Sequence, residues 1–404
     1  MNFNNSMTTT TLFIITLASN SVSAENCTSV PVNPQGDTSK LQAALQQATN
    51  TGVELVLTGT YYITQDTKVY LRNDLKVDAS DAQFLATEQL DGDMFSFDTH
   101  STKSDECGGA SAMANFEWSG GTFNMAKAKV STVVPLPYKT PIGREGTKQT
   151  ADAISVRGAT SAGKSKLNEL LIENIVFIGT ENDTEPYYMA GGDSGILMTG
   201  ALKAIIRNNS FFGVRDAAIY VSAGGVSGEY GDHFTLTNNY VERAYDGITS
   251  KRGADNIKML SNIMHDVVVG LSIKRVYDGW TATNVNISNN SVSNSVRPIS
   301  VERANDVVID NNHIDNLGSV VADSLIPTNK YGQQYEGISL NGVQGSNLIS
   351  NNIINGITQD GSREKDTTTW GIVLRPEDGR ETTNVVIEDN SYSRLDKWVN
   401  RILL

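Results

Sequence analysis

The sequence predicts an all-β protein that folds as a right-handed, single-stranded parallel β-helix with a capping helix at its amino terminus. Two features lead to this prediction. A short apolar motif recurs along residues 150–390, and an asparagine follows several of its copies at a nearly constant distance. A helical solenoid would instead need long amphipathic segments with a 3.6-residue period, and the repeat has none. A single helical pattern stands before the repeat, where it can close the open end of a coil.

The composition excludes several classes of protein. The chain has 404 residues, of which 39% are hydrophobic and 19% are charged, as in a globular protein. Its net charge of −13 argues against non-specific binding to nucleic acid and against binding to anionic membrane surfaces. Beyond the first 24 residues there is no long apolar run, so no membrane-spanning segment is expected.

Residues 1–24 are predicted to be a secretory signal. Thr11–Ala18 is a short apolar stretch, and a small-x-small pattern ends at Ala24. This arrangement predicts cleavage before Glu25 and export, so we expect a secreted or periplasmic protein. A membrane anchor is the alternative, although the apolar run is too short to span a bilayer. The mature chain, residues 25–404, is expected to be one β-helix domain.

Two cysteines, Cys27 and Cys107, are the only thiols in the chain. Export implies an oxidising compartment, where a single pair of cysteines favours one disulfide bond. That bond would tie the amino terminus to a later turn. Two unpaired, buried thiols are the alternative.

The predicted amino-terminal cap covers residues 25–65. Residues 37–49 have apolar side chains at helical spacing, and Asp37 is the expected N-cap. The apolar positions are Leu41, Ala44, Leu45 and Ala48. Strand patterns follow this helix, so it can cover the first coil. The run Val32–Asp37 resembles the amino-terminal cap of the pectate-lyase-like β-helix proteins, which implies the same fold.

The repeated motif has a central apolar residue, which we call the anchor. The eight anchors are Ile154, Ile196, Ile219, Ile248, Leu271, Ile299, Ile338 and Ile372. The shortest interval between anchors is 23 residues, which fits one coil built of three short strands. The longer intervals are the same coil with a loop added. The regular coils are therefore expected over residues 150–390.

A column of asparagines is expected to mark one turn of each coil. The predicted members are Asn209, Asn239, Asn262, Asn290, Asn312 and Asn352. Stacked turn asparagines can hydrogen-bond to their neighbours along the axis of the coil. The segments on either side alternate apolar and polar residues, as strands do.

Basic side chains gather on the outer face of the anchor strands. Successive strand residues point to opposite faces, so the residues one and three places after each anchor point outward. The basic residues at the second of these positions or one place after it are Lys251, Arg252, Lys274, Arg275 and Arg303, and Arg297 leads into its strand. Neighbouring coils lie about 4.8 Å apart. Like charges at that spacing repel unless an anion compensates them. The sequence therefore predicts a groove for a polyanion; a solvated stripe with salt-bridge partners is the alternative.

Other side chains extend the predicted groove. Glu302 and Asn341 occupy the outward position three places after an anchor. His233 and His265 each adjoin an aspartate, and each could bind substrate or relay a proton; a structural turn histidine is the alternative. Long loops flank the anchor strands and carry aromatic side chains that suit sugar rings. These are Tyr138, Tyr187, Tyr188, Tyr230, Trp280, Tyr331 and Tyr335.

Three catalytic designs can be compared with these residues. Glycoside hydrolysis needs two carboxylates on one face. The outward positions supply only Glu302, although Asp216 and Asp246 stand just before their strands. Calcium-dependent elimination needs a cluster of carboxylates, which the outward positions do not supply. Metal-free β-elimination of a uronan needs a base with a lowered pKa, a proton donor and a cation near the substrate carboxylate. No metal or other cofactor is therefore expected.

Tyr220 and Lys251 match the third design. Lys251 lies among other cations, so its pKa should be depressed. Tyr220 points outward on the preceding coil, about 8 Å away on the diagonal between Cα atoms. Two side chains of this length can converge on one sugar unit. Which of the two is the base and which the acid stays open.

At these residues the sequence resembles the β-helical alginate lyases. It looks most like polysaccharide lyase family 31, whose members use a Tyr and a Lys on successive coils. The matching segments here are Ala218–Ser222 and Asp246–Arg252. The Ser250–Lys251 pair, with Lys274 and Arg275 one coil later, is also similar to the Lys and Arg pair of family 6 lyases. In those enzymes the Lys is the base and calcium assists.

This resemblance implies an exported lyase that acts on alginate, with Tyr220 and Lys251 as the catalytic pair. The expected partner is an anionic polysaccharide, and a monomer is expected. Two alternatives remain. One is an inverting glycoside hydrolase that uses Asp216 and Asp246 on an acidic polysaccharide. The other is a non-catalytic polysaccharide-binding β-helix. Preference for mannuronate or guluronate, and endo or exo action, are not predicted.

Overall fold

The computed structural model describes most of the chain from residue 28 onward. The described residues are 28–99, 104–105, 108–109, 114–128, 151–158, 167–184, 187, 190–223, 231–274, 281–318, 334–357 and 368–401. The predicted signal segment, residues 1–24, lies outside these ranges. So do Cys27, Cys107 and Arg275.

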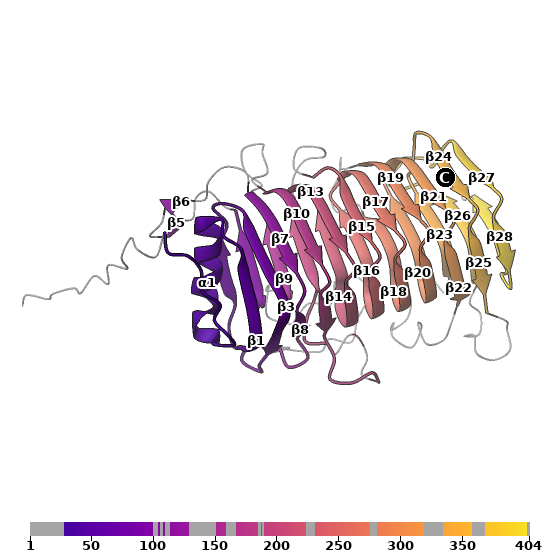
Figure 1. Ribbon diagram of the computed structural model, residues 1–404. Helices are drawn as coiled ribbons and strands as arrows, with labels where there is room; N and C mark the ends of the chain where they lie inside the picture. Colours follow the sequence, from indigo (N-terminus) through magenta and orange to yellow (C-terminus); the bar gives the residue numbers. More distant parts are fainter. Residues whose placement is uncertain are drawn as a thin grey trace, which may run out of the picture.

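The described strands form a right-handed parallel β-helix, as the sequence predicts. Twenty-seven strands join in one sheet that winds along the axis, and every pairing within it is between strands of successive coils. Figure 1 shows these coils stacked from α1 at one end to β28 at the other. Parallel pairing already begins at Leu55, where β1 pairs with β3, well before the first anchor of the repeat.

The anchor sheet contains the strands that carry the anchors. Its strands are β2 (Thr67–Tyr70), β4 (Phe95–Asp98), β9 (Ile154–Arg157), β12 (Ile196–Thr199), the carboxyl-terminal halves of β14 (Ser210–Ser222), β16 (Tyr240–Lys251), β18 (Ile263–Lys274) and β20 (Ser291–Glu302), then β23 (Gln334–Asn341), β26 (Thr368–Arg375) and β29 (Lys397–Arg401). It positions the predicted site.

Two further sheets complete each coil. The second sheet follows the anchor sheet and contains the amino-terminal halves of β1 (Leu55–Ile63) and β3 (Leu75–Ala86), then β7 (Ala114–Ser119), β10 (Leu167–Glu173), β13 (Ala201–Arg207), β15 (Phe234–Thr237), β17 (Asp255–Leu260), β19 (Ala282–Ser288), β21 (Ala304–Asp310), β24 (Asn347–Ser350) and β27 (Val385–Glu388). The third sheet contains the carboxyl-terminal halves of β1 and β3, then β8 (Thr122–Asn124), β11 (Val176–Ile178), the amino-terminal halves of β14, β16, β18 and β20, and β22 (His313–Leu317), β25 (Ile353–Gly356) and β28 (Ser391–Ser393). A short antiparallel pair, β5 (Ser104–Asp105) and β6 (Gly108–Gly109), lies outside the helix.

The capping helix is α1 (Thr38–Thr51), and it confirms the prediction for residues 37–49. Asp37 is the N-cap, where its carboxylate accepts a hydrogen bond of 3.1 Å from the backbone N–H of Ser39. Gly52 ends the helix with a φ of 70°, the left-handed conformation that glycine adopts most readily. Leu41 and Leu45 are buried against the first coil. Within the described part of the chain, no helix has the length and apolar character needed to cross a membrane.

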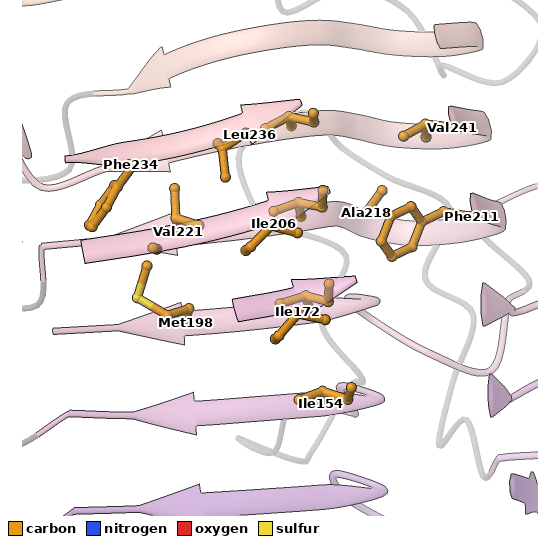
Figure 2. Close-up of a cluster of buried hydrophobic side chains, with 14 of the residues drawn as sticks. Ile154, Ile172, Met198, Ile206, Phe211, Ala218, Val221, Phe234, Leu236 and Val241 are labelled. Carbon is orange, nitrogen blue, oxygen red and sulfur yellow. The ribbon is translucent and has the colours of Figure 1, made fainter. Parts of the chain in front are cut away.

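The core is a set of apolar columns along the axis. All eight anchors are fully buried, and they stand in register on successive strands from Ile154 to Ile372. Figure 2 shows the same stacking for Met198 and Val221 of the anchor sheet and for Ile172, Ile206 and Leu236 of the second sheet. The repeat in the sequence therefore corresponds to the inward face of one strand per coil.

The predicted asparagine column is also confirmed. Each side-chain amide donates to the carbonyl oxygen of the next asparagine at 2.9–3.0 Å, from Asn209 through Asn352. The column continues to Asn390, which the repeat did not reveal. The residue before each ladder asparagine has a positive φ, from 53° to 60°. That conformation turns the chain from the second sheet to the third, and asparagine and aspartate tolerate it better than most residues.

Candidate functional site

Tyr220 and Lys251 lie together on the outer face of the anchor sheet. Their strands, β14 and β16, are neighbours, with Tyr220 opposite Thr249 and Ser222 opposite Lys251. The Lys251 ammonium nitrogen stands 4.3 Å from the centroid of the Tyr220 ring. Since Ile219 is fully buried on the inward face, the alternation of the strand directs Tyr220 outward. The two side chains that the sequence selected from different coils are therefore in contact.

The next coil supplies a second ammonium group. Lys274 follows Lys251 in the register of β18, and its side chain contacts the carboxylate of Asp246. Asp246 lies within β16, two places before the anchor Ile248, whereas Lys274 ends β18, so the contact runs along the outer face. Thr249 and Ser272 lie between these ends in register and are fully buried, with their hydroxyl oxygens 3.0 Å apart. Small residues at this position leave space for the long side chains above them.

The environment shifts the pKa of Lys251 downward, as the sequence predicts. The main cause is burial, which disfavours the charged ammonium. The positive charge of Lys274 acts in the same direction, while the carboxylate of Asp216 opposes the shift. The sequence argument relied on neighbouring cations alone, but desolvation is the larger effect here.

Asp216 is the second carboxyl group near the pair. Its pKa is raised, mainly by desolvation and also by the negative charge of Asp246, while Lys251 and Lys274 oppose the shift. Asp246 is buried and in contact with an ammonium group. Two ammonium groups and two carboxyl groups thus share this part of the outer face, and their charges offset each other.

The same pairing recurs along the helix. A carboxylate two places before the anchor position of one coil contacts a cation at the end of the next anchor strand. Asp93 is 3.2 Å from Arg157, Asp246 contacts Lys274, and Glu336 contacts Arg375. The sequence carried a signal for this pattern, because Asp246 and Glu336 each stand two places before an anchor. The predicted basic stripe is therefore partly neutralised by acids of the protein itself.

Arg297 belongs to such a neutralised cluster. Its guanidinium lies 3.2 Å from one carboxylate oxygen of Glu336, and Arg375 contacts the other. Arg297 and Glu336 are both buried. For Lys274 and Arg297, the structure thus agrees with the alternative to a polyanion groove, which is a basic stripe with salt-bridge partners. Their predicted contacts to substrate stay predictions.

Two further predicted cations, Arg252 and Arg303, lie at the corner where the anchor sheet turns into the second sheet. Arg252 and Arg303 each follow the last residue of an anchor strand and have positive φ values of 67° and 48°. Glu302 and Asn341 are register neighbours at the ends of β20 and β23. Glu302 is half-buried and Asn341 is buried. These four residues share one edge of the outer face.

The two predicted histidines are not brought to the Tyr220–Lys251 pair. His233 lies at the start of β15 in the second sheet, with Nδ1 2.9 Å from Asp232. His265 lies on the third sheet, where its Nδ1 is 2.8 Å from the hydroxyl of Ser293. Among the predicted loop aromatics, Tyr187 and Tyr335 are buried, and the other five lie outside the described residues.

Two other observations describe the surroundings. Among the described residues, no group of three or more His, Cys, Asp or Glu side chains is arranged to hold a metal ion. A surface cleft of about 970 Å³ lies on the third sheet near the amino-terminal end, and its lining includes Tyr62, Leu85 and Lys127. That cleft contains none of the residues predicted for the site.

The comparisons with known proteins concern the fold. No family model matches the sequence, and no curated protein matches it. Among solved structures, the A-module of a mannuronan C-5 epimerase from Azotobacter vinelandii has a TM-score of 0.48 at 12% identity, over 89% of this chain and 93% of that one. A tailspike protein of E. coli bacteriophage HK620, in complex with a hexasaccharide, has a TM-score of 0.49 at 11% identity, over 89% and 63%. An adhesin of Streptococcus pneumoniae has a TM-score of 0.47 at 14% identity, over 93% and 99%.

Proposed function

We propose that this protein is an exported polysaccharide lyase that cleaves alginate by metal-independent β-elimination, with Tyr220 and Lys251 as its acid–base pair. The observation that carries the proposal is the contact between these two side chains, 4.3 Å from ammonium to ring centroid, on the outer face of neighbouring coils. The lowered pKa of Lys251 supports it, because a larger fraction of the amine is then neutral and able to accept a proton.

The proposed reaction needs three groups. A base removes the proton at C5 of a uronate unit, the C4–O bond breaks, and the electron pair of the C5–H bond becomes the new C4–C5 double bond. An acid returns a proton to the departing glycosidic oxygen. Negative charge develops on the substrate carboxylate as C5 loses its proton, and a nearby cation stabilises it. Lys274, held by Asp246, is the described cation nearest in register to Lys251.

The roles within the pair can be assigned by experiment. If Lys251 is the base, activity rises with pH as its ammonium loses a proton, and Tyr220 donates to the leaving oxygen. If Tyr220 serves as both base and acid, Lys251 stays charged and favours the tyrosinate. The pH dependence of kcat/KM in the Tyr220→Phe and Lys251→Arg variants separates the two cases, because only the first requires a neutral amine at position 251.

The test of the proposal follows the ultraviolet absorbance of the unsaturated uronate product during incubation with alginate. We expect Lys251→Ala and Tyr220→Phe each to lower turnover by about 10²–10⁴-fold, the usual contribution of a general acid or base. Lys203→Ala is the matched control, because Lys203 lies on the second sheet in an exposed ion pair with Glu169. Near wild-type turnover in both site variants would contradict the assignment of Tyr220 and Lys251 as the acid–base pair.

One specific observation favours a second candidate, an inverting glycoside hydrolase. Asp216 has a raised pKa, whereas the carboxylate of Asp246 contacts the ammonium group of Lys274. Two carboxyl groups in different environments can serve as general acid and general base. New reducing ends without unsaturated product, both lost in Asp216→Asn, would favour this candidate. Binding of alginate with neither product would favour a non-catalytic binding protein.

A further inference from the structure

A tight hairpin follows the last strand of the anchor sheet that carries an anchor. Glu377 and Arg380 exchange backbone hydrogen bonds of 2.9 and 3.0 Å. Between them, Asp378 and Gly379 have positive φ values of 48° and 74°. Two left-handed residues in a two-residue loop form a type I′ turn, for which Asp-Gly is a favoured sequence. The turn therefore holds the backbone of Arg380 in one conformation.

The hairpin packs closely on a neighbouring coil at Gly342. A Cβ atom there would lie 2.9 Å from the Cβ of Glu377 and 3.3 Å from the carbonyl oxygen of Arg380. Gly342 also has a φ of 62°, which disfavours a side chain. It follows Asn341, at the edge that carries Glu302 and Arg303. The fold thus brings Arg380 against the edge of the predicted groove.

The Arg380 side chain extends along this edge to earlier coils. Its Nη1 donates to the hydroxyl of Thr281 at 3.2 Å, and its Nη2 donates to the carbonyl oxygen of Ala304 at 3.3 Å. Nη2 also contacts the side-chain oxygen of Asn305. All three acceptors are neutral, so they orient the guanidinium without neutralising its charge. The contact with Ala304 spans 76 residues of sequence.

Arg303 immediately precedes Ala304 and places a second guanidinium at this point. The Nε atoms of Arg303 and Arg380 are both buried, and neither has a hydrogen-bond partner. Within the described ranges, no carboxylate forms an ion pair with either residue. The pKa of Arg380 is lowered by burial first and by the charge of Arg303 second. Two like charges held together with unused donors are unfavourable unless an anion binds between them.

We propose that Arg303 and Arg380 form an anion subsite that binds the carboxylate of a uronate unit next to the unit being cleaved. This proposal rests on the function proposed above. Arg303 follows the strand two coils after that of Lys251, about 10 Å along the axis. An oligosaccharide lying along the outer face spans that distance. Guanidinium groups bind planar oxyanions in a charge-assisted, often bidentate geometry. A free oxyanion such as sulfate shares this chemistry.

The experiment measures equilibrium binding by titration calorimetry in the Lys251→Ala background, where no turnover interferes. The probes are a uronate hexasaccharide from alginate, a neutral hexasaccharide of glucose, and inorganic sulfate. Arg303→Gln and Arg380→Gln are the test variants. Arg303→Gln removes no described hydrogen bond, so it should fold normally. Arg207→Gln is the matched control, because Arg207 lies on the second sheet in an ion pair with Glu173.

We expect each test variant to bind the uronate hexasaccharide about tenfold more weakly, the effect of losing one charge-assisted hydrogen bond. Binding of the neutral hexasaccharide should be weak and unchanged, and the control should behave as the parent. With position 251 restored to Lys, KM should rise while kcat changes little, because the subsite lies away from the reacting bond.

Three results would overturn the subsite or separate it from the proposed function. Equal affinity in Arg303→Gln and in the parent protein would overturn it even if the enzyme cleaves alginate. Sulfate binding that depends on these arginines, with unchanged hexasaccharide affinity, would assign the site to a free oxyanion and also overturn it. The third result is weaker hexasaccharide binding by the arginine variants together with no unsaturated product from the protein that has Lys251. It would support the subsite and contradict the proposed lyase activity.

Discussion

The contact between Lys274 and Asp246 offers a quantitative test of how the site is built. The Asp246 side chain is 1% exposed and the Lys274 side chain is 23% exposed. The second carboxylate oxygen of Asp246, Oδ1, is buried without a hydrogen-bond partner. The ammonium group is therefore an important compensation for a buried negative charge. Lys274→Gln, Asp246→Asn and the double variant form a complete double-mutant cycle.

The structure sets the expected magnitudes. Lys274→Gln leaves a buried carboxylate without its ammonium and should lower the free energy of unfolding by about 3–5 kcal/mol. Asp246→Asn leaves an ammonium that is already partly exposed and can move towards water, so about 1–2 kcal/mol is expected. The double variant replaces two charges with two neutral amides and should lose about 1–2 kcal/mol. The resulting coupling energy is about 3–5 kcal/mol.

Chemical denaturation measures the stability part, and turnover of alginate measures the functional part. If Lys274 also stabilises charge on the substrate, the double variant recovers stability but keeps a lowered kcat. A Lys274→Gln variant as stable as the wild type would refute the buried ion pair. A double variant that recovers both stability and kcat would show that Lys274 has a structural role only.

Three further predictions concern metal, the asparagine column and pH. Activity should persist in EDTA, because Asp246 contacts Lys274 and no group of three or more His, Cys, Asp or Glu among the described residues is arranged to hold a metal ion; complete, calcium-reversible loss would contradict this. Asn262→Ala should lower the free energy of unfolding by about 3–5 kcal/mol, because buried partners on both sides lose hydrogen bonds. A loss as small as that of the control Lys203→Ala, at an exposed ion pair of the second sheet, would be inconsistent with the ladder. Burial raises the pKa of Asp66 from 3.8 to about 6. Its proton is held more tightly in the folded state, so its contribution to stability is present below pH 3.8 and is lost as the pH rises through about 6. Asp66→Asn should therefore stabilise the protein at pH 7 by about 1–2 kcal/mol and change little at pH 3.5, as measured by denaturation at both pH values.

The coil architecture could be predicted from the sequence because a solenoid repeats its local environment. Each anchor occupies the same position in its coil, so burial selects the same apolar residue type at each copy. The turn asparagines recur for the same reason, since each satisfies the one before it. The repeat in the sequence reveals neither Asn390 nor the coils before residue 150. In those early coils the anchor position holds other residue types, Thr67 and Phe95, instead of the recurring Ile or Leu.

The pair of outward side chains, Tyr220 and Lys251, could also be predicted from the sequence. Alternation along a strand and the register between coils place Tyr220 near Lys251, and the structure shows them in contact. Periodicity constrains the backbone, so it predicts which residues share a face. It does not predict where a long side chain ends, because lysine and arginine can reach several residues along that face.

The partners of the charged groups were therefore decided only by the tertiary structure. Lys274 contacts an aspartate 28 residues earlier, and Arg375 contacts a glutamate 39 residues earlier. Loops of different length separate these residues, so no fixed spacing in the sequence links them. Arg380 reaches Thr281 across 99 residues because a hairpin directs it back along the corner. The sequence by itself determined which side chains face outward, since that depends on local alternation. Which of their charges remain to attract a polyanion depends on contacts between coils, and those exist only in the folded chain.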